Sequence, residues 1–215
     1  MQKDALNPEH LKALAKADTR LAPLTEAFAH LSYRRRPGGF KALLRLIIEQ
    51  QLSVKAADTI LLRLQAGVGD LSPERLLAHD GELMRSYGLS RPKISYARAL
   101  AEAFHTGQFD AGDLQNLEIE EATRRLTALR GIGTWTAEVY LMFCEGRPDL
   151  FPVGDIALRE AVGWLDRCDS RPNEAYCAER AQDWAPYRSI AAQLLWAWYG
   201  AVKRGDMSRD LTLKT

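Results

Sequence analysis

The sequence predicts an all-α protein, and three observations support that prediction. Apolar residues recur at the 3.6-residue spacing of a helix in one segment after another, and segments with the alternating pattern of a strand are nearly absent. Glycine and proline interrupt the pattern at short intervals, which predicts roughly ten short helices. Hydrophobic residues make up 47% of the 215-residue chain and charged residues 27%, the mixture of a globular protein with a sizeable core.

Four stretches carry the clearest apolar stripe of an amphipathic helix. They run over residues 40–48, 57–64, 94–104 and 190–198. Ser72 followed by Pro73 predicts a further helix start, with serine as the cap and proline in the first turn. Two more helices are expected on either side of the pair Gly131 and Gly133, and another over residues 156–164.

Composition argues against several classes of protein. No apolar run approaches the ~20 residues that cross a bilayer, and the first residues form no signal-peptide core, so we expect a cytoplasmic protein without a membrane partner. The three cysteines and four histidines lack the spacing of a disulfide framework, a zinc site or an iron–sulfur cluster. The formal net charge of +1 neither requires nor excludes a nucleic-acid partner, because only the placement of charges decides.

The segment most informative about chemistry runs from Leu129 to Ala137. Two glycines in three residues between two helices allow a tight hairpin, and they let backbone N–H groups of the second helix approach a phosphate. The alternative is an ordinary helical hairpin in which glycine only ends a helix. For the glycine pair taken alone, that alternative is favoured.

Asp155 lies 22 positions after Gly133, behind a loop rich in proline and glycine and directly before a predicted helix. Aspartate is a favoured N-cap, and the positive end of a helix favours a negative charge. The same carboxylate can present a fixed anion to a cationic transition state. Capping and catalysis are therefore compatible roles for this residue.

Four blocks of sequence, in this order, resemble the helix-hairpin-helix DNA glycosylases, and most closely the 3-methyladenine DNA glycosylase II branch of AlkA-like enzymes. The blocks are residues 47–57 with their Gln-Gln pair, residues 88–93, the hairpin through Asp155, and residues 184–189 with Trp196. Each block is weak alone. Four in the family's order, over about residues 40–200, are a specific signal.

The resemblance implies one glycosylase module with a two-lobed fold and an active site in the cleft between the lobes. The central lobe is expected over about residues 38–145 and the second from about 1–37 plus 146–215. The chain begins about forty residues before the first block, too few for the β-rich N-terminal domain of longer members. The implied partner is double-stranded DNA containing alkylated bases, bound by a monomer.

The resemblance also implies the reaction. The enzyme would flip an alkylated base out of the duplex and hydrolyse its N-glycosidic bond in base excision repair, acting on 3-methyladenine, 7-methylguanine and also 1-methyladenine. Asp155 is the implied catalytic residue, which stabilises oxocarbenium character on the sugar and orients or deprotonates water. Trp135 stands where bifunctional members carry a nucleophilic lysine, and residues 126–147 contain no lysine, so we expect no AP lyase activity.

By resemblance, several residues are assigned to a substrate pocket and a DNA-binding surface. Aromatic faces attract a cationic base, and the pocket candidates are Trp135, Trp196, Tyr140 and Tyr187, whereas Trp164, Trp184 and Trp198 are assigned to the core. The DNA-binding candidates are Gln50, Gln51, Leu52, Ser53, Gly131, Gly133, Thr134, Thr136, Arg91, Lys93 and Arg188. Residues 50–52 are the candidate wedge that fills the vacated base stack, the alternative being that the glutamines only cap helices. No cofactor is expected apart from a Na⁺ or K⁺ at the hairpin backbone, residues Arg130–Gly133.

Other functions remain open at this point. One is a monofunctional glycosylase for deaminated or mismatched bases, and another is a non-catalytic helix-hairpin-helix DNA-binding module in which Asp155 only caps a helix. A helical partner-binding scaffold without DNA affinity is disfavoured by the hairpin. Glu49 departs from the family pattern, because it places an anion beside the turn that is expected to face DNA.

Overall fold

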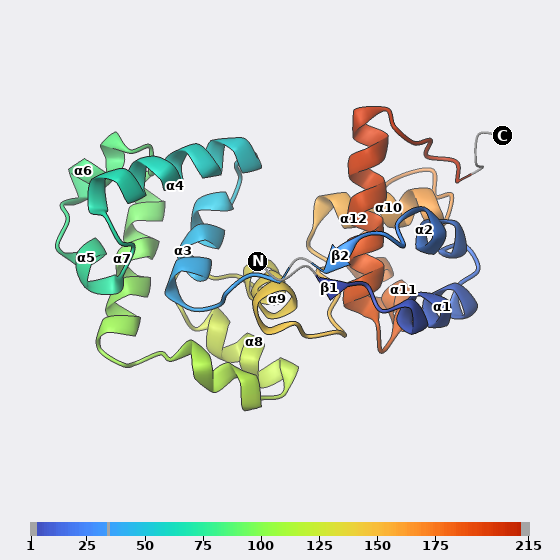
Figure 1. Cartoon of the computed structure of the whole chain (residues 1–215), viewed down its shortest axis with the longest axis horizontal. Coiled ribbons are helices and arrows are strands. Elements are labelled where there is room, and N and C mark those ends of the chain that lie inside the picture. Colours follow the sequence, from blue (N-terminus) through green and yellow to red (C-terminus); the bar gives the residue numbers. More distant parts are fainter. Residues whose placement is uncertain (1–3, 34, 212–215) are drawn as a thin grey trace. The chain divides into compact units, whose positions relative to one another are not determined.

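The computed structural model describes residues 4–33 and 35–211, and the chain divides into two compact units (Figure 1). Unit 1 comprises Met1–Arg35 and Gly146–Thr215, and unit 2 comprises Arg36–Glu145. The all-α prediction is confirmed, since the strands among the described residues are β1 (Asp4–Ala5) and β2 (Ser32–Tyr33), which form one short antiparallel pair. Within the described part of the chain, no helix has both the length and the apolar character that crossing a membrane requires.

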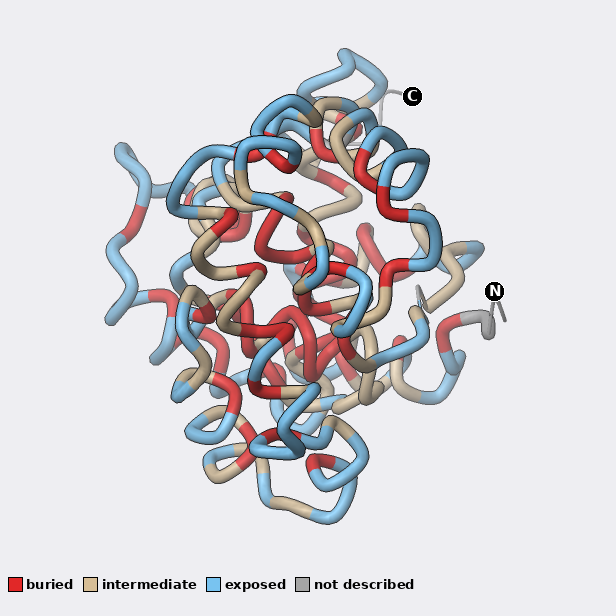
Figure 2. Tube along the Cα trace, turned by 90° about the vertical axis from the view of Figure 1, so that its left-hand side faces the viewer, coloured by how far each residue is buried: buried red, intermediate tan, exposed pale blue. Residues whose placement is uncertain are grey.

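Unit 1 is built from both ends of the chain. Its helical elements are α1 (Pro8–Ala17), α2 (Ala22–Ala27), α10 (Ile156–Leu165), α11 (Glu174–Arg180), the 3-10 turn η3 (Ala181–Trp184) and α12 (Arg188–Arg204). Helix α12 packs against α10, α2, α1 and η3. Residues 189–195 of α12 are all buried, so this helix is the centre of the unit rather than an amphipathic surface helix. Figure 2 shows the buried stretches of the chain in red.

A buried ionic cluster joins the two chain segments of unit 1. Arg180 donates hydrogen bonds to Asp18 and Asp166, and Trp184 Nε1 donates to Asp18 Oδ2 at 3.1 Å. Burial favours a higher pKa for Asp18, but the hydrogen bonds from Arg180 and Trp184 outweigh it and lower that pKa. Trp184 and Trp198 are fully buried, as predicted, and Trp164 is half-buried and stacks on Tyr199 with ring centroids 5.4 Å apart.

Unit 2 is formed by the middle of the chain. Its elements are α3 (Phe40–Glu49), α4 (Val54–Val68), α5 (Pro73–Leu77), α6 (Gly81–Ser86), α7 (Arg91–His105), η1 (Ala111–Asn116), α8 (Ile119–Thr127), α9 (Thr134–Tyr140) and the π-helical turn η2 (Leu141–Glu145). The predicted stripe of α3 is buried against α7, α4 and α9. Ser72 caps α5 as predicted and accepts a hydrogen bond from Arg75 N at 3.3 Å.

Candidate functional site

The predicted hairpin connects α8 to α9 in unit 2. Gly131 has a φ of +89°, in the left-handed region that favours glycine. A Cβ at this position would lie 2.3 Å from Cγ of Tyr96, so the residue also lacks room for a side chain. Gly133 is exposed directly before α9, and a Cβ there would meet no described atom within 4 Å. An exposed, small residue at the start of α9 fits the phosphate-binding interpretation of this hairpin.

Gln50 lies directly after α3, and its side chain connects the turn between α3 and α4 (residues 50–53) to the hairpin. Its Nε2 donates hydrogen bonds to the carbonyl oxygen of Gly131 at 2.9 Å and to Thr136 Oγ1 at 3.2 Å. Thr136 is buried, with 2% of its surface exposed. The prediction that Thr136 contacts DNA is therefore corrected, because its side chain is buried and binds Gln50. Gln50 holds the turn against the hairpin, and its contact with DNA stays a prediction.

Lys93, near the start of α7, holds the same turn from another side. Its Nζ donates to the carbonyl oxygens of Ile48 and Gln50 at 2.8 and 2.7 Å, at the C-terminal end of α3. Burial lowers the pKa of this ammonium group. The side chain therefore caps α3, and a role of Lys93 in DNA binding stays a prediction. Arg91 is exposed, and its role in DNA binding stays a prediction.

The tip of the turn remains exposed. Gln51 has a φ of +57°, which is unusual for a residue other than glycine, and Leu52 is 40% exposed. Ser53 caps α4 and accepts a hydrogen bond from Ala56 N at 3.3 Å. A strained, exposed apolar tip is consistent with the predicted wedge. Thr134 is also exposed, at the start of α9.

Glu49, the anion that departs from the family pattern, is paired within unit 2. Its carboxylate lies 2.6 Å from Arg45 Nε and 3.9 Å from Arg36 Nη1. The negative charge beside the turn is therefore compensated. The i, i+4 spacing of Arg45 and Glu49 is the sequence signal that predicts such a pair.

Asp155, in unit 1, caps α10 as predicted. Its Oδ1 accepts a hydrogen bond from Leu158 N at 3.0 Å. The same oxygen accepts a second hydrogen bond from Trp196 Nε1 at 3.1 Å. Two donors from different helices therefore hold one oxygen of a half-buried carboxylate.

The loop that leads to Asp155 is attached to the start of α12. Arg188 binds Asp149 in a bidentate pair, with Nε–Oδ1 at 2.7 Å and Nη2–Oδ2 at 2.8 Å. The hydrogen bond from Arg188 lowers the pKa of Asp149. Ser189 Oγ accepts from Leu150 N at 3.0 Å and donates to the carbonyl oxygen of Arg147 at 2.8 Å. The Arg188 guanidinium is thus paired with Asp149 within unit 1, and its contact with DNA stays a prediction.

The four aromatic pocket candidates lie in different environments. Tyr140 is fully buried in unit 2, where its hydroxyl accepts a hydrogen bond from Gly39 N at 2.8 Å, and burial raises its pKa to about 12. Its assignment to the pocket is wrong, because a base cannot reach a ring in the core. Tyr187 is half-buried and stacks on His10 with ring centroids 4.2 Å apart. Trp135 and Trp196 are also half-buried, and their contacts with a base stay predictions.

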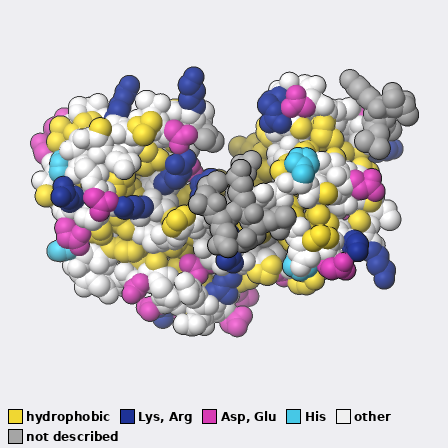
Figure 3. All heavy atoms as spheres, in the orientation of Figure 1, with side chains coloured by type: hydrophobic (Ala, Val, Ile, Leu, Met, Phe, Trp, Pro, Cys, Tyr) yellow, Lys and Arg dark blue, Asp and Glu magenta, His cyan; other side chains and the backbone are white. Residues whose placement is uncertain are grey.

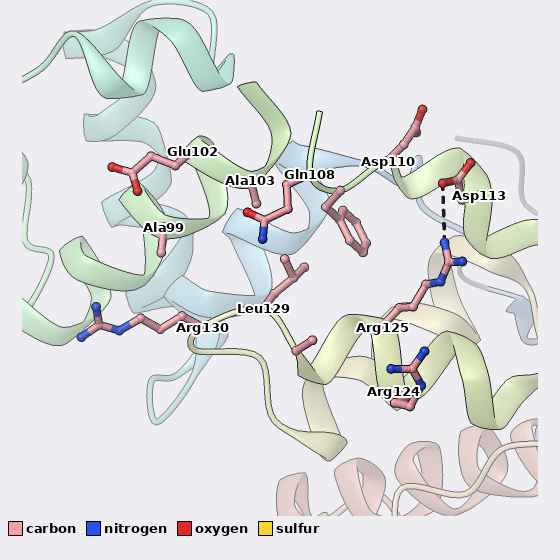
Figure 4. A pocket seen from close by; sticks show the side chains of 12 residues that line it. Ala99, Glu102, Ala103, Gln108, Asp110, Asp113, Arg124, Arg125, Leu129 and Arg130 are labelled. Carbon is pink, nitrogen blue, oxygen red and sulfur yellow. Dashed lines mark ion pairs between the residues drawn. The ribbon is translucent and has the colours of Figure 1, made fainter. Parts of the chain in front are cut away.

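A surface pocket of about 480 Å³ is present on unit 2 (Figure 4). It is lined by residues of α7, η1 and α8, by the segment 108–110 between α7 and η1, and by residues 128–130 after α8. An ion pair of 3.6 Å joins Arg125 to Asp113. The aromatic candidates are not among its lining residues, so it is not the expected base pocket. Basic and acidic side chains are interspersed over unit 2 in the view of Figure 3.

Comparison with known proteins places the chain in a family. The model of the "HhH-GPD superfamily base excision DNA repair protein" matches residues 44–186. The chain is 32% identical over 202 residues to DNA-3-methyladenine glycosylase 1 of Schizosaccharomyces pombe, covering 87% of this chain and 89% of the relative.

Two solved structures agree with this match. A DNA-3-methyladenine glycosidase from Bacillus halodurans superposes with a TM-score of 0.84 at 32% identity, covering 98% of this chain and 97% of that one. A 3-methyladenine DNA glycosylase from S. pombe in complex with abasic DNA gives a TM-score of 0.81 at 29% identity, covering 93% and 99%. With the helical hairpin and the capping aspartate in place, the chain belongs to the HhH-GPD superfamily of base excision DNA repair proteins.

Proposed function

We propose that this protein is a DNA glycosylase that flips alkylated bases out of duplex DNA and hydrolyses their N-glycosidic bonds. The observation that carries the proposal is Asp155, a carboxylate fixed at the N-terminus of α10 by hydrogen bonds from Leu158 N and Trp196 Nε1. The relatives reported above are named 3-methyladenine DNA glycosylases, which supports 3-methyladenine as a substrate. We extend the proposal to 7-methylguanine and 1-methyladenine.

The proposed chemistry needs little beyond a fixed anion. An N-alkylated purine carries a positive charge and leaves the sugar without protonation by the enzyme. Departure of the base leaves oxocarbenium character on the sugar, and a preorganised carboxylate stabilises that charge. In this reaction Asp155 also orients or deprotonates the attacking water.

Hydrolysis without strand cleavage is part of the proposal. AP lyase activity of bifunctional glycosylases requires an amine nucleophile that forms a Schiff base with the sugar. Residues 126–147, which include α9 and η2, contain no lysine, and Trp135 is the second residue after the glycine pair, where bifunctional members carry the lysine. The protein is therefore proposed to leave an intact abasic site.

DNA binding is assigned to exposed residues of unit 2. The N-terminus of α9 at Gly133 and Thr134 would bind a phosphate, and Gln51 with Leu52 would fill the vacated stack. A Na⁺ or K⁺ would bind backbone oxygens at the hairpin. The carbonyls of Leu129 and Gly131 accept hydrogen bonds from Ile132 N at 3.0 Å and Gln50 Nε2 at 2.9 Å. A carbonyl oxygen has two lone pairs, so a second lone pair of each group would bind the ion, which would add positive charge near a phosphate.

The test compares the wild type with Asp155→Asn on methylated DNA. Asparagine keeps an oxygen that accepts the bonds from Leu158 and Trp196, so folding and affinity for abasic-site DNA should stay close to wild type. Base release, measured by chromatography of the freed purines, should fall by about 100-fold or more. Asp169→Asn, at an exposed aspartate in the loop after α10, is the control and should release bases at the wild-type rate.

Four results would contradict the proposal. Unchanged turnover of Asp155→Asn would remove the catalytic assignment. Wild-type protein that binds DNA without releasing any base would be a DNA-binding module. Release of uracil, hypoxanthine or mismatched bases in preference to alkylated purines, from a panel of defined duplexes, would assign the other glycosylase class. Strand cleavage at the resulting abasic site without added alkali would show lyase activity.

A further inference from the structure

We propose that Trp196 is a positioning residue of this reaction: its indole N–H fixes the orientation of the Asp155 carboxylate, a role that rests on the proposed function of Asp155. As an aromatic residue near the active-site aspartate, Trp196 would otherwise be assigned only to stacking against the base. The geometry points instead to the N–H group as the part of the side chain that acts on catalysis.

The hydrogen bonds at Asp155 support this role. Oδ1 accepts one bond from Leu158 N, three residues along α10, and one at 3.1 Å from Trp196 Nε1, which lies 41 residues away on α12. The torsion about Cβ–Cγ of aspartate is broad, so the capping bond alone leaves the carboxylate plane poorly defined. A second donor from another helix restricts that rotation.

The donor itself is rigidly placed. Trp196 follows Leu194 and Leu195, which are fully buried at the centre of unit 1, and precedes the fully buried Trp198. Movement of the Trp196 backbone would therefore disturb these fully buried side chains. A donor on such a helix can position the group it binds.

Helix α12 holds the other end of the same loop as well. Arg188 binds Asp149 in the bidentate pair, and Ser189 Oγ bonds to the backbone of Arg147 and Leu150. The loop from 147 to 155 is thus attached to α12 near its start, through Arg188 and Ser189, and at its end, through Trp196. Helix α12 therefore holds both ends of the loop from 147 to 155 in place.

Orientation of this carboxylate matters because its charge must face the sugar as the base leaves. A displacement of about 1 Å in a catalytic group can lower a rate by about 100-fold. Loss of the indole N–H is therefore expected to lower the rate of bond cleavage and to leave DNA affinity unchanged. Loss of a stacking surface would instead weaken substrate binding and leave the rate of bond cleavage in the bound complex unchanged.

The experiment removes the N–H and keeps the ring. Site-specific replacement of Trp196 by 3-benzothienylalanine puts sulfur in place of the indole N–H group at nearly the same shape, and Trp196→Phe is the genetically encoded counterpart. The single-turnover rate of 3-methyladenine release at saturating enzyme should fall about 10- to 100-fold in both variants. The dissociation constant for abasic-site DNA should stay within about twofold of wild type. The same analogue at Trp164, which stacks on Tyr199, should leave the rate unchanged.

A double-mutant cycle adds a readout that a purely structural role would not give. In an Asp155→Ala background, Trp196→Phe should cause no further loss, because the N–H acts through the carboxylate. A wild-type rate for the benzothienyl variant would overturn the positioning role while leaving the proposed function intact. Equal losses from Trp196→Phe with and without Asp155 would also overturn it. An absence of base release by the wild type would instead overturn the proposed function.

Discussion

The side-chain amide of Gln50 donates a hydrogen bond of 2.9 Å to the carbonyl oxygen of Gly131, 81 residues further along the chain. Lys93 holds the same turn through the carbonyl oxygens of Ile48 and Gln50. The turn that carries the exposed Leu52 and the hairpin that precedes α9 are therefore joined by hydrogen bonds within unit 2. These bonds connect the residue expected to enter the base stack to the backbone expected to bind a phosphate.

Replacement of Gln50 tests this connection. Gln50→Ala removes the bonds to Gly131 and Thr136, and the free energy of unfolding should fall by about 1–2 kcal/mol. Affinity for abasic-site DNA, measured by fluorescence anisotropy, should fall several-fold because the turn loses its fixed position. Gln51→Ala, at an exposed neighbour, should change stability in urea unfolding by less than about 0.5 kcal/mol. Equal losses of stability in the two variants would contradict the connection.

The two glycines of the hairpin should respond differently to alanine. Gly131→Ala forces a side chain into a φ of +89° and against the ring of Tyr96, so stability should fall by at least about 1–2 kcal/mol. Gly133→Ala adds a methyl group where no described atom lies within 4 Å, so the protein should fold normally. Its DNA affinity should nevertheless fall, since the methyl group obstructs a phosphate. Thermal unfolding measures the loss of stability, and fluorescence anisotropy measures the loss of DNA affinity. A Gly131→Ala variant as stable as the wild type would contradict the predicted strain at this position.

Variants of Lys93 and Arg91 can be compared in the salt dependence of DNA binding. Lys93→Met removes a helix cap, so stability should fall by about 1–3 kcal/mol while the slope of log Kd against log salt stays at the wild-type value. Arg91→Met should keep stability within about 0.5 kcal/mol and reduce the magnitude of that slope by about 1, as expected for a lost phosphate contact. If Lys93→Met also reduced the slope of log Kd against log salt, Lys93 would be shown to contact a phosphate.

The Asp149–Arg188 pair gives a pH dependence with a defined sign. The hydrogen bond from Arg188 lowers the pKa of Asp149 from its ordinary value of 3.8 in the folded protein. Its contribution to stability is therefore complete above about pH 4 and is lost as the pH falls through the lower, folded-state pKa.

Asp149→Asn should accordingly lower the free energy of unfolding at pH 7 by about 1 kcal/mol and flatten its decline below about pH 4. Urea titrations at pH 7, 5 and 3 measure both effects. Asp206→Asn, which breaks the exposed pair with Arg204, is the control and should leave the curve unchanged. If the free energy of unfolding of Asp149→Asn declined below about pH 4 as steeply as that of the wild type, the Asp149–Arg188 pair would be shown not to contribute to stability.

The sequence alone predicted what depends on neighbours a few residues away. Helix α10 begins at Asp155 because its carboxylate binds an N–H three residues later, and the same local rule places Ser72 before α5. The position of the hairpin followed from glycines that the backbone needs, and the apolar stripe of α3 followed from helical periodicity. Such features need no knowledge of the distant chain.

Only the tertiary structure decided which polar and aromatic residues remain available to DNA. Lys93 and Arg188 are equally plausible as phosphate ligands in a sequence, yet each is engaged by groups about forty residues away. Tyr140 has the chemistry of a pocket wall and is buried in the core. The physical reason is that the chemistry of a side chain determines which groups it can bind. Which of those groups it meets depends on contacts between segments far apart in the chain.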